Sequence, residues 1–180
     1  CIPDPLTNDH VAPPRDRGLS RVLFLGSCSR PKGVFDTLEA CDRLNRQSPG
    51  RYFLTIAGGF ESAEEETEFR ARLAALPPGT AQFVGFADAT AKRALFAQAD
   101  VFCFPTTYAH EGQPLTLIEA LAHDVPIVTT RWRAIPGMLP AANVWYVEPS
   151  QPDALAPALA AAATARPGGA LRRHYLDHFT

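Results

Sequence analysis

The chain has no apolar run long enough to cross a membrane, and its first residues lack the basic and apolar regions of a signal peptide. Neither sign of charge is in excess: 17 Lys and Arg stand against 19 Asp and Glu, for a formal net charge of -2. This balance excludes a broad nucleic-acid-binding surface and restricts phosphate binding to a local site. We therefore predict a cytoplasmic chain without a nucleic-acid partner.

Cysteine is scarce, and its spacing offers no metal or redox motif. The four cysteines are Cys1, Cys28, Cys41 and Cys103, with no C-x-x-C pair among them. Cys103 falls in an apolar run, where a thiol usually acts as a small hydrophobe. Cys28 has two cations nearby in the sequence and is a candidate nucleophile, but isolated cysteines are mostly structural. We assign these residues no chemistry.

Apolar runs of strand length alternate with helical segments along most of the 180 residues, of which 46% are hydrophobic. The predicted strands are Arg21–Leu25, Tyr52–Ala57, Gln82–Phe86, Val101–Phe104, Pro126–Thr129 and Val144–Val147. The predicted helices are Val34–Arg46, Ser62–Leu76, Thr90–Gln98 and Pro114–His123, with a short turn at Ile135–Leu139. Strands separated by helices imply right-handed crossovers. The sequence therefore predicts an α/β fold with a Rossmann-like, doubly wound parallel sheet of about six strands.

The two ends of the chain differ in pattern from this middle part. Residues 1–18 are rich in proline and have no sustained period, so we predict an interdomain linker there. We place the Rossmann-like domain at residues 19–165, closing with an alanine-rich helix at Pro152–Thr164. Residues 166–180 read as the start of a C-terminal helical segment after Pro167-Gly-Gly169. We expect the chain to be one half of a longer protein.

Two carboxylates, Glu111 and Glu119, lie eight residues apart where a loop enters a helix. Pro114 suits the first helical position, because the N–H that it lacks would be unpaired there. Glu119 then falls in the second turn and leans back toward the N-terminal mouth of the helix. We expect the apolar stripe of this helix to contain Leu115, Ile118, Leu121 and Ala122.

Free N–H groups and the positive end of a helix favour an anion, while flanking carboxylates accept hydrogen bonds from paired hydroxyls. A phosphate flanked by two diols describes a sugar nucleotide. The alternative is that Glu111 caps the helix and Glu119 is solvated on its outer face. Spacing alone leaves both interpretations open.

The loop after the first predicted strand, Gly26–Gly33, combines small residues with the cations Arg30 and Lys32. Such a loop suits a diphosphate approached by backbone groups and a point charge. It matches neither the dinucleotide fingerprint G-x-G-x-x-G nor the phosphate-binding P-loop. A surface turn with a solvated lysine is the alternative.

The string Glu111-Gly-Gln-Pro-Leu-Thr-Leu-Ile-Glu119, followed by Val125-Pro-Ile-Val-Thr129, resembles the E-x7-E signature of retaining glycosyltransferases with a GT-B fold, of the family 4 type. Further stretches follow in that family's order: Thr55–Gly59, Phe83–Phe86 and Ala99–Pro105. The similarity covers about residues 19 to 165, and Ile2–Pro5 resembles the family's interdomain linker. The resemblance implies one half of a GT-B fold, the C-terminal donor-binding domain.

The resemblance also implies roles for individual residues. Glu111 would contact hydroxyls of the donor sugar, Glu119 would hold the ribose, and Lys32 would clamp the diphosphate. Glu111 and Lys32 are therefore the expected catalytic residues. The expected donor-binding set is Gly26, Arg30, Lys32, Glu111, Gly112, Gln113, Pro114, Leu115 and Glu119. The base would lie near the loops after Gly58 and Gly85, and nothing in the sequence identifies it.

Three positions depart from the family pattern. The arginine usual after the first glycine is Ser27 here, with Arg30 as a candidate substitute three residues later. Asp124 stands where a glycine is usual, and Gly137 where an acidic residue is expected. Neither Asp124 nor Gly137 is expected to alter the reaction class, and whether Arg30 replaces the missing arginine stays open. The chain lacks an Asp-x-Asp motif, and the resemblance implies no metal and no cofactor, since a cation and a helix end can stabilise the leaving diphosphate.

The sequence therefore favours an enzyme of polysaccharide biosynthesis, a hexosyltransferase whose donor is a nucleoside-diphosphate sugar. Its acceptor is expected to be a glycan, a lipid-linked or a small molecule. The resemblance places an acceptor-binding domain N-terminal to this chain, so the isolated fragment would be inactive, and it allows peripheral membrane association of the full-length protein. Two alternatives are a sugar-nucleotide epimerase and a noncatalytic nucleotide-binding or regulatory α/β domain. The second would need an acidic cluster after the first strand, where this chain has cations.

Overall fold

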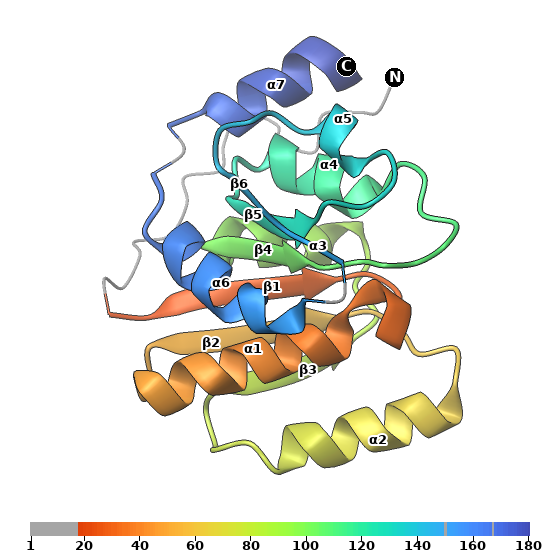
Figure 1. Cartoon of the computed structure of the whole chain (residues 1–180), viewed down its shortest axis with the longest axis vertical. Coiled ribbons are helices and arrows are strands. Elements are labelled where there is room, and N and C mark those ends of the chain that lie inside the picture. Colours follow the sequence, from red (N-terminus) through yellow and green to blue (C-terminus); the bar gives the residue numbers. More distant parts are fainter. Residues whose placement is uncertain (1–17, 150, 167) are drawn as a thin grey trace.

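The fold is built on a six-stranded parallel sheet in the order β3-β2-β1-β4-β5-β6 (Figure 1). The computed structural model describes residues 18–149, 151–166 and 168–180. The strands are β1 Ser20–Leu25, β2 Tyr52–Ala57, β3 Ala81–Gly85, β4 Val101–Phe104, β5 Ile127–Thr130 and β6 Val144–Val147. This strand order is that of dinucleotide-binding Rossmann folds, and the predicted fold class is confirmed.

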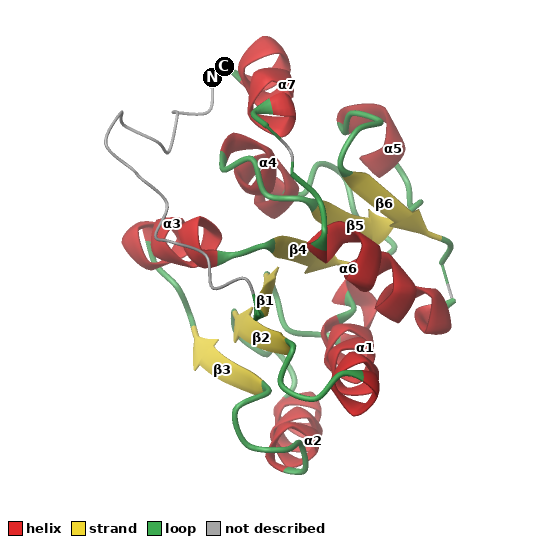
Figure 2. Cartoon of the chain, turned by 90° about the vertical axis from the view of Figure 1, so that its left-hand side faces the viewer, coloured by secondary structure: helices red, strands yellow, loops and turns green. Residues whose placement is uncertain are grey.

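Helices cover both faces of the sheet (Figure 2). One face carries α1 Val34–Gln47, α2 Ala63–Ala74 and α6 Leu155–Ala163, and the opposite face carries α3 Ala89–Gln98, α4 Leu115–Ala122 and α5 Ile135–Met138. The last helix, α7 Ala170–Phe179, packs on α4. Two short 3-10 turns, η1 Arg30–Lys32 and η2 Pro152–Ala154, precede α1 and α6.

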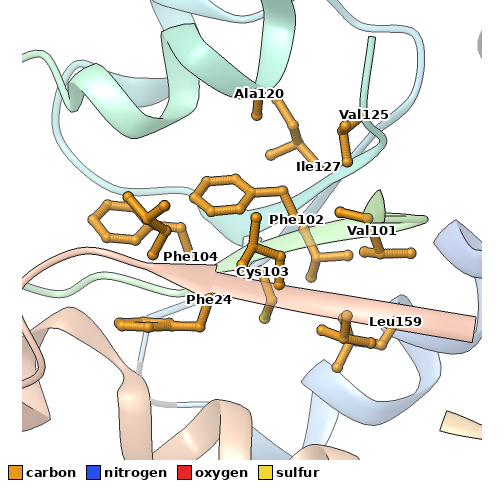
Figure 3. Packing of buried hydrophobic residues seen from close by; sticks show 14 of the residues in the cluster. Phe24, Val101, Phe102, Cys103, Phe104, Ala120, Val125, Ile127 and Leu159 are labelled. Atoms are coloured by element: carbon orange, nitrogen blue, oxygen red, sulfur yellow. The ribbon is translucent and has the colours of Figure 1, made fainter. Parts of the chain in front are cut away.

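The core lies along the central strands. Every residue of β4 and of β5 is buried, as expected for parallel strands covered on both faces. Figure 3 labels Phe24 of β1 and Phe102 and Phe104 of β4, the next strand in the sheet. The centres of the Phe24 and Phe104 rings are 6.1 Å apart, and Phe102 stacks on Phe104. The chain runs from β1 outward to β3 and then returns to β4, so the strand order reverses between β1 and β4. Ligands of such sheets bind at this point, beyond the carboxyl ends of the strands.

Helix α4 begins one residue later than the sequence predicts, and its buried face contains the predicted Ile118, Leu121 and Ala122 but is wider than the predicted stripe. Pro114 has φ -63° and ψ 112°, so it caps the helix instead of forming its first residue. Leu115 is 63% exposed, so the expected stripe was wrong at that position. The buried face includes Leu117 and Ala120 because α4 lies between the sheet and α7, which cover more than one side of it.

Asp124 anchors α7 to the end of α4. Its backbone has φ +55°, a left-handed conformation that explains why glycine suits this turn and that Asp tolerates better than most residues. Its carboxylate accepts hydrogen bonds from the N–H groups of Gly169 at 2.6 Å, Leu171 at 3.0 Å and Arg172 at 3.3 Å. An acidic side chain at the first turn of a helix is stabilising. The departure at this position therefore has a structural role.

The predicted linker lies outside the described residues except for Gly18, so the domain boundaries stay predictions. Among the helices that the structure describes, none has the length and apolarity needed to cross a membrane.

Candidate functional site

The loops after β1 and β4 come into direct contact at the carboxyl edge of the sheet (Figure 1). Gly33 permits this contact: it has φ +82°, and a Cβ at this position would lie 2.5 Å from Pro105 Cγ. A side chain here would be strained and would separate the two loops. The Pro31 carbonyl accepts from the Thr107 N–H at 2.7 Å, which fixes the turn of η1 against the second loop.

This contact brings Lys32 and Glu111 together. Lys32 Nζ donates to Glu111 Oε2 at 2.8 Å, and the Thr106 hydroxyl donates to the same oxygen at 2.7 Å. The Glu111 side chain is only 7% exposed, so its charge is held by these two donors in a largely dry setting. Lys32 Nζ also lies 4.5 Å from the centre of the Tyr108 ring, within the range of a cation–π contact.

A third loop, the one after β5, supports the backbone that carries Glu111. The Tyr108 carbonyl accepts from the Glu111 N–H at 3.1 Å and from the Trp132 indole Nε1–H at 2.8 Å. The Thr130 hydroxyl donates to the Thr106 carbonyl. Sequence reasoning missed Thr106, Tyr108 and Trp132. The available signal was that β4 and β5 are consecutive parallel strands, whose following loops must meet.

Glu119 has a different partner, Lys92 of α3. Lys92 Nζ donates to Glu119 Oε1 in an ion pair, and Glu119 Oε2 is buried without a hydrogen-bond partner among the described residues. A buried carboxylate oxygen without a donor is costly unless a ligand or water satisfies it. The second oxygen of Glu119 thus lacks a partner among the described residues, and a shift of the side chain would make it available to a hydroxyl. Lys92 was not identified from the sequence.

A cavity of about 610 Å³ opens between the loops after β1, β2 and β3 and the start of α3. Gly58 shapes it: a Cβ there would lie 1.8 Å from the Gly26 carbonyl oxygen, so the first two loops cross without room for a side chain. Phe86 lines the cavity and is 86% exposed. Lys92 lines both this cavity and the small pocket that contains Glu119, so the two are adjacent.

The other predicted donor-binding residues, apart from Arg30, lie in three places. Gly26 lines the large cavity, Pro114 is buried as the cap of α4, and Gly112, Gln113 and Leu115 are exposed in front of that helix or in its first turn.

The Arg30 side chain pairs with carboxylates of α2 and not with the Lys32–Glu111 pair. Its guanidinium pairs with Glu68 and lies 4.0 Å from Glu65, both on α2, and its carbon is 4.3 Å from the centre of the Phe35 ring. The hydrogen bond to Glu68 raises the pKa of Arg30 above its ordinary value. The structure brings Lys32 to Glu111 but does not bring Arg30 to that pair.

The cysteines have no reactive geometry. Burial, with a smaller effect from Glu66, raises the pKa of the Cys28 thiol to about 12, so it is not a ready nucleophile. In the part of the chain that the structure describes, no group of three or more His, Cys, Asp or Glu is arranged to hold a metal ion.

Comparison with known proteins identifies the family. Residues 20–164 match the family described as glycosyl transferases group 1. Glycogen synthase of Mycobacterium tuberculosis is 36% identical over 114 residues, covering 63% of this chain and 26% of that protein. A colanic acid biosynthesis glycosyltransferase of Escherichia coli, WcaL, named as putative, is 27% identical over 146 residues, covering 78% of this chain and 35% of that protein. The chain thus spans about a quarter to a third of these relatives.

Solved structures share the fold. HepE of Anabaena in complex with UDP-glucose superposes with a TM-score of 0.76 at 18% identity, covering 89% of this chain and 45% of that one. The C-terminal domain of a group 1 glycosyl transferase family protein, LpcC of Francisella tularensis, gives 0.71 at 17% identity, covering 89% and 86%. With the sequence match over most of its length, the chain belongs to the group 1 glycosyl transferases.

Proposed function

We propose that this chain is the C-terminal, donor-binding half of a retaining glycosyltransferase that takes a sugar from a nucleoside-diphosphate sugar. The observation that supports this most is the Lys32–Glu111 pair, 2.8 Å apart at the switch point of the sheet and in front of α4. A cation, a carboxylate and a helix start at one point match the phosphates and hydroxyls of such a donor.

Lys32 and the start of α4 take the diphosphate in this proposal. The first N–H groups of a helix have no intrahelical partner; Leu115 supplies one, and Gly112 and Gln113 add the N–H groups of the loop that leads into the helix. Pro114 has no N–H to offer, but its fixed φ directs the chain into the helix. Gly26 leaves room for the backbone of the first loop to approach the same phosphates. Arg30 can contribute a second cation if it leaves its partners on α2.

The sugar and the nucleoside lie on opposite sides of the diphosphate. Glu111 accepts hydrogen bonds from hydroxyls of the donor sugar, with Lys32 and Thr106 holding its carboxylate in place. Glu119 accepts from the ribose hydroxyls once its side chain turns the buried Oε2 toward the ligand. The base occupies the cavity next to Lys92, which adjoins the Glu119 pocket.

Transfer with retention needs no protein nucleophile in this scheme. The leaving phosphate takes the proton of the acceptor hydroxyl as the acceptor attacks from the same face. Lys32 and the helix start stabilise the charge that develops on the leaving diphosphate, and a positioned cation can do this without a metal ion. Glu111 orients the sugar during the step.

The rest of the enzyme lies outside this chain. We propose an N-terminal domain that binds a glycan, lipid-linked or small-molecule acceptor, and a role in polysaccharide biosynthesis. The cysteines Cys28, Cys41 and Cys103 are buried free thiols, which suits the reducing cytoplasm. Peripheral membrane association of the full-length protein stays a prediction.

Isothermal titration of the chain with UDP, GDP and ADP, and with their hexose derivatives, tests the proposal. We expect one nucleoside diphosphate and its sugar to bind in the micromolar range, because charge-assisted hydrogen bonds of about 1.5–3 kcal/mol each add to stacking of the base in the cavity. A folded sample that binds none of them would favour the noncatalytic alternative. We also expect this chain alone to transfer no sugar, and turnover by it would refute the need for an N-terminal half.

A further inference from the structure

The large cavity carries three ionisable side chains, and one of them is unused. Asp88 caps α3, where its Oδ1 accepts from the Ala91 N–H at 2.8 Å. Lys92 is paired with Glu119. Glu61, the third, is exposed and has no ion-pair or hydrogen-bond partner among the described residues. The cavity therefore offers an incoming ligand one uncommitted carboxylate.

An aromatic surface lines the same cavity. Phe86 follows directly after β3, and 86% of it is exposed, which makes it the most exposed of the large hydrophobic residues that the structure describes. An apolar ring left open beside a cavity is a surface on which a planar base can stack. Stacking tolerates every base, because each has a π-face, so Phe86 supplies affinity without choosing among bases.

Glu61 can discriminate among the bases, because their hydrogen-bonding edges differ. An ionised carboxylate accepts with both oxygens and donates nothing. Guanine presents two adjacent donors, N1–H and the 2-amino group, which match a carboxylate in bidentate fashion. Uracil presents one N–H between two carbonyl oxygens, and adenine presents one amino group beside a ring acceptor, so each would oppose a carboxylate with at least one acceptor.

From this arrangement we infer that the donor nucleotide carries guanine, recognised by Glu61 and stacked on Phe86. The inference rests on the proposed function and assigns the base that the sequence leaves open. A guanine edge satisfies both oxygens of Glu61 at once, and a site that hydrogen-bonds both groups rejects analogues that lack them.

Titration of the chain with GDP, UDP and ADP under one buffer tests the inference. We expect GDP to bind at least about tenfold more tightly than UDP or ADP, which is within the usual discrimination of a bidentate base contact. UDP or ADP binding as tightly as GDP would overturn the guanine assignment while leaving the proposed function in place. Binding of none of the three by a folded chain would overturn the proposed function, and this inference with it.

Two variants, Glu61→Gln and Phe86→Ala, with Glu64→Gln as a control, test the role of each residue in binding the base. Glu61→Gln replaces one acceptor oxygen by a donor, so we expect GDP to lose about tenfold in affinity while UDP and ADP change less than about twofold. Glu64→Gln makes the same charge change at an exposed position outside the cavity and should leave all three unchanged. Phe86→Ala should weaken all three together. Unchanged GDP affinity in Glu61→Gln would overturn the role of Glu61, and unchanged affinity in Phe86→Ala would overturn the stacking.

Discussion

The two ends of the candidate site are built differently. At one end, Lys32 and Glu111 are largely buried and tied to each other, and the loops after β1, β4 and β5 are joined by hydrogen bonds. At the other end, the large cavity has an exposed Phe86 and a Glu61 without a partner among the described residues, and the adjacent small pocket contains Glu119 with one unsatisfied oxygen. The end assigned to diphosphate and sugar is preorganised, whereas the end assigned to the nucleoside has exposed or unsatisfied groups that a ligand would complete.

This difference fits the demands of the proposed reaction. Groups that act on the reacting atoms gain most from being fixed before the substrate arrives, because no reorganisation is then needed in the transition state. Groups that only bind can be completed by the ligand. Substitutions at the preorganised end should therefore disturb binding of the diphosphate and the sugar, and those at the open end should show which groups hold the nucleoside.

The largest effect is expected for Lys32→Ala. The change removes a charge-assisted bond of about 1.5–3 kcal/mol, so nucleoside diphosphate affinity should fall about 30-fold in a calorimetric titration. Because Glu111 would be left without its cation, the double variant Lys32→Ala, Glu111→Gln separates lost binding from a disturbed fold.

Arg30→Ala is the matched control for that experiment. Arg30 is a cation of the same loop that is paired with Glu68 on α2, so we expect a loss of no more than about threefold from screened electrostatics. A loss equal to that of Lys32→Ala would instead show that Arg30 leaves α2 and acts as the second diphosphate cation.

Glu119→Ala should weaken nucleotide binding by about tenfold, because a hydroxyl loses a charged acceptor. The tightest-binding nucleoside diphosphate and its 2′,3′-dideoxy analogue distinguish a ribose contact from a general disturbance. The wild-type chain should prefer the natural nucleotide, and the variant should bind both alike. A variant that still discriminates between them would remove Glu119 from the ribose site.

Glu111→Ala should act on the sugar alone. We expect the sugar nucleotide to lose about fivefold in affinity and the free nucleoside diphosphate less than about twofold, since only the former carries the donor sugar whose hydroxyls Glu111 accepts from. The comparison of both ligands on the same preparation supplies its own control. Equal losses would place Glu111 at the phosphates instead.

The smallest effect concerns the buried thiols, to which neither end of the site assigns a role. Burial raises the pKa of Cys103 to about 12, as it does for Cys28, so the folded state favours the neutral thiol. The resulting stability is fully present below about pH 9 and is lost as the pH rises toward 12, because the unfolded chain ionises first. Denaturant unfolding should show this decline, and Cys28→Ala should make it shallower. An unchanged slope in that variant would contradict the assignment.

The sequence predicted the sheet well because each strand is an apolar run bounded by polar turns, and parallel strands buried on both faces must be apolar throughout. β3 illustrates the limit: its predicted end at Phe86 is one residue too long, and that residue is the exposed ring beside the cavity. The sequence pattern also did not predict the burial of α4 by a second helix. Helix α7 covers part of α4 and changes which of its residues are buried.

The candidate site was predictable where the reversal of strand order decides, as for Lys32 and Glu111, which follow the strands β1 and β4 that meet at the switch point of the sheet. It was not predictable where the packing of helices decides. Lys92 pairs with Glu119 because α3 and α4 lie side by side. Arg30 pairs with α2 because Glu65, Glu68 and the Phe35 ring surround its guanidinium.

A crystal structure of this chain with a bound nucleoside-diphosphate sugar is the decisive test of the proposed donor site. We expect the diphosphate within hydrogen-bonding distance of Lys32 Nζ and the N–H groups in front of α4, the sugar hydroxyls on Glu111, and the ribose on Glu119. A donor bound elsewhere, or one in this place with Glu111 and Glu119 both out of contact, would contradict it.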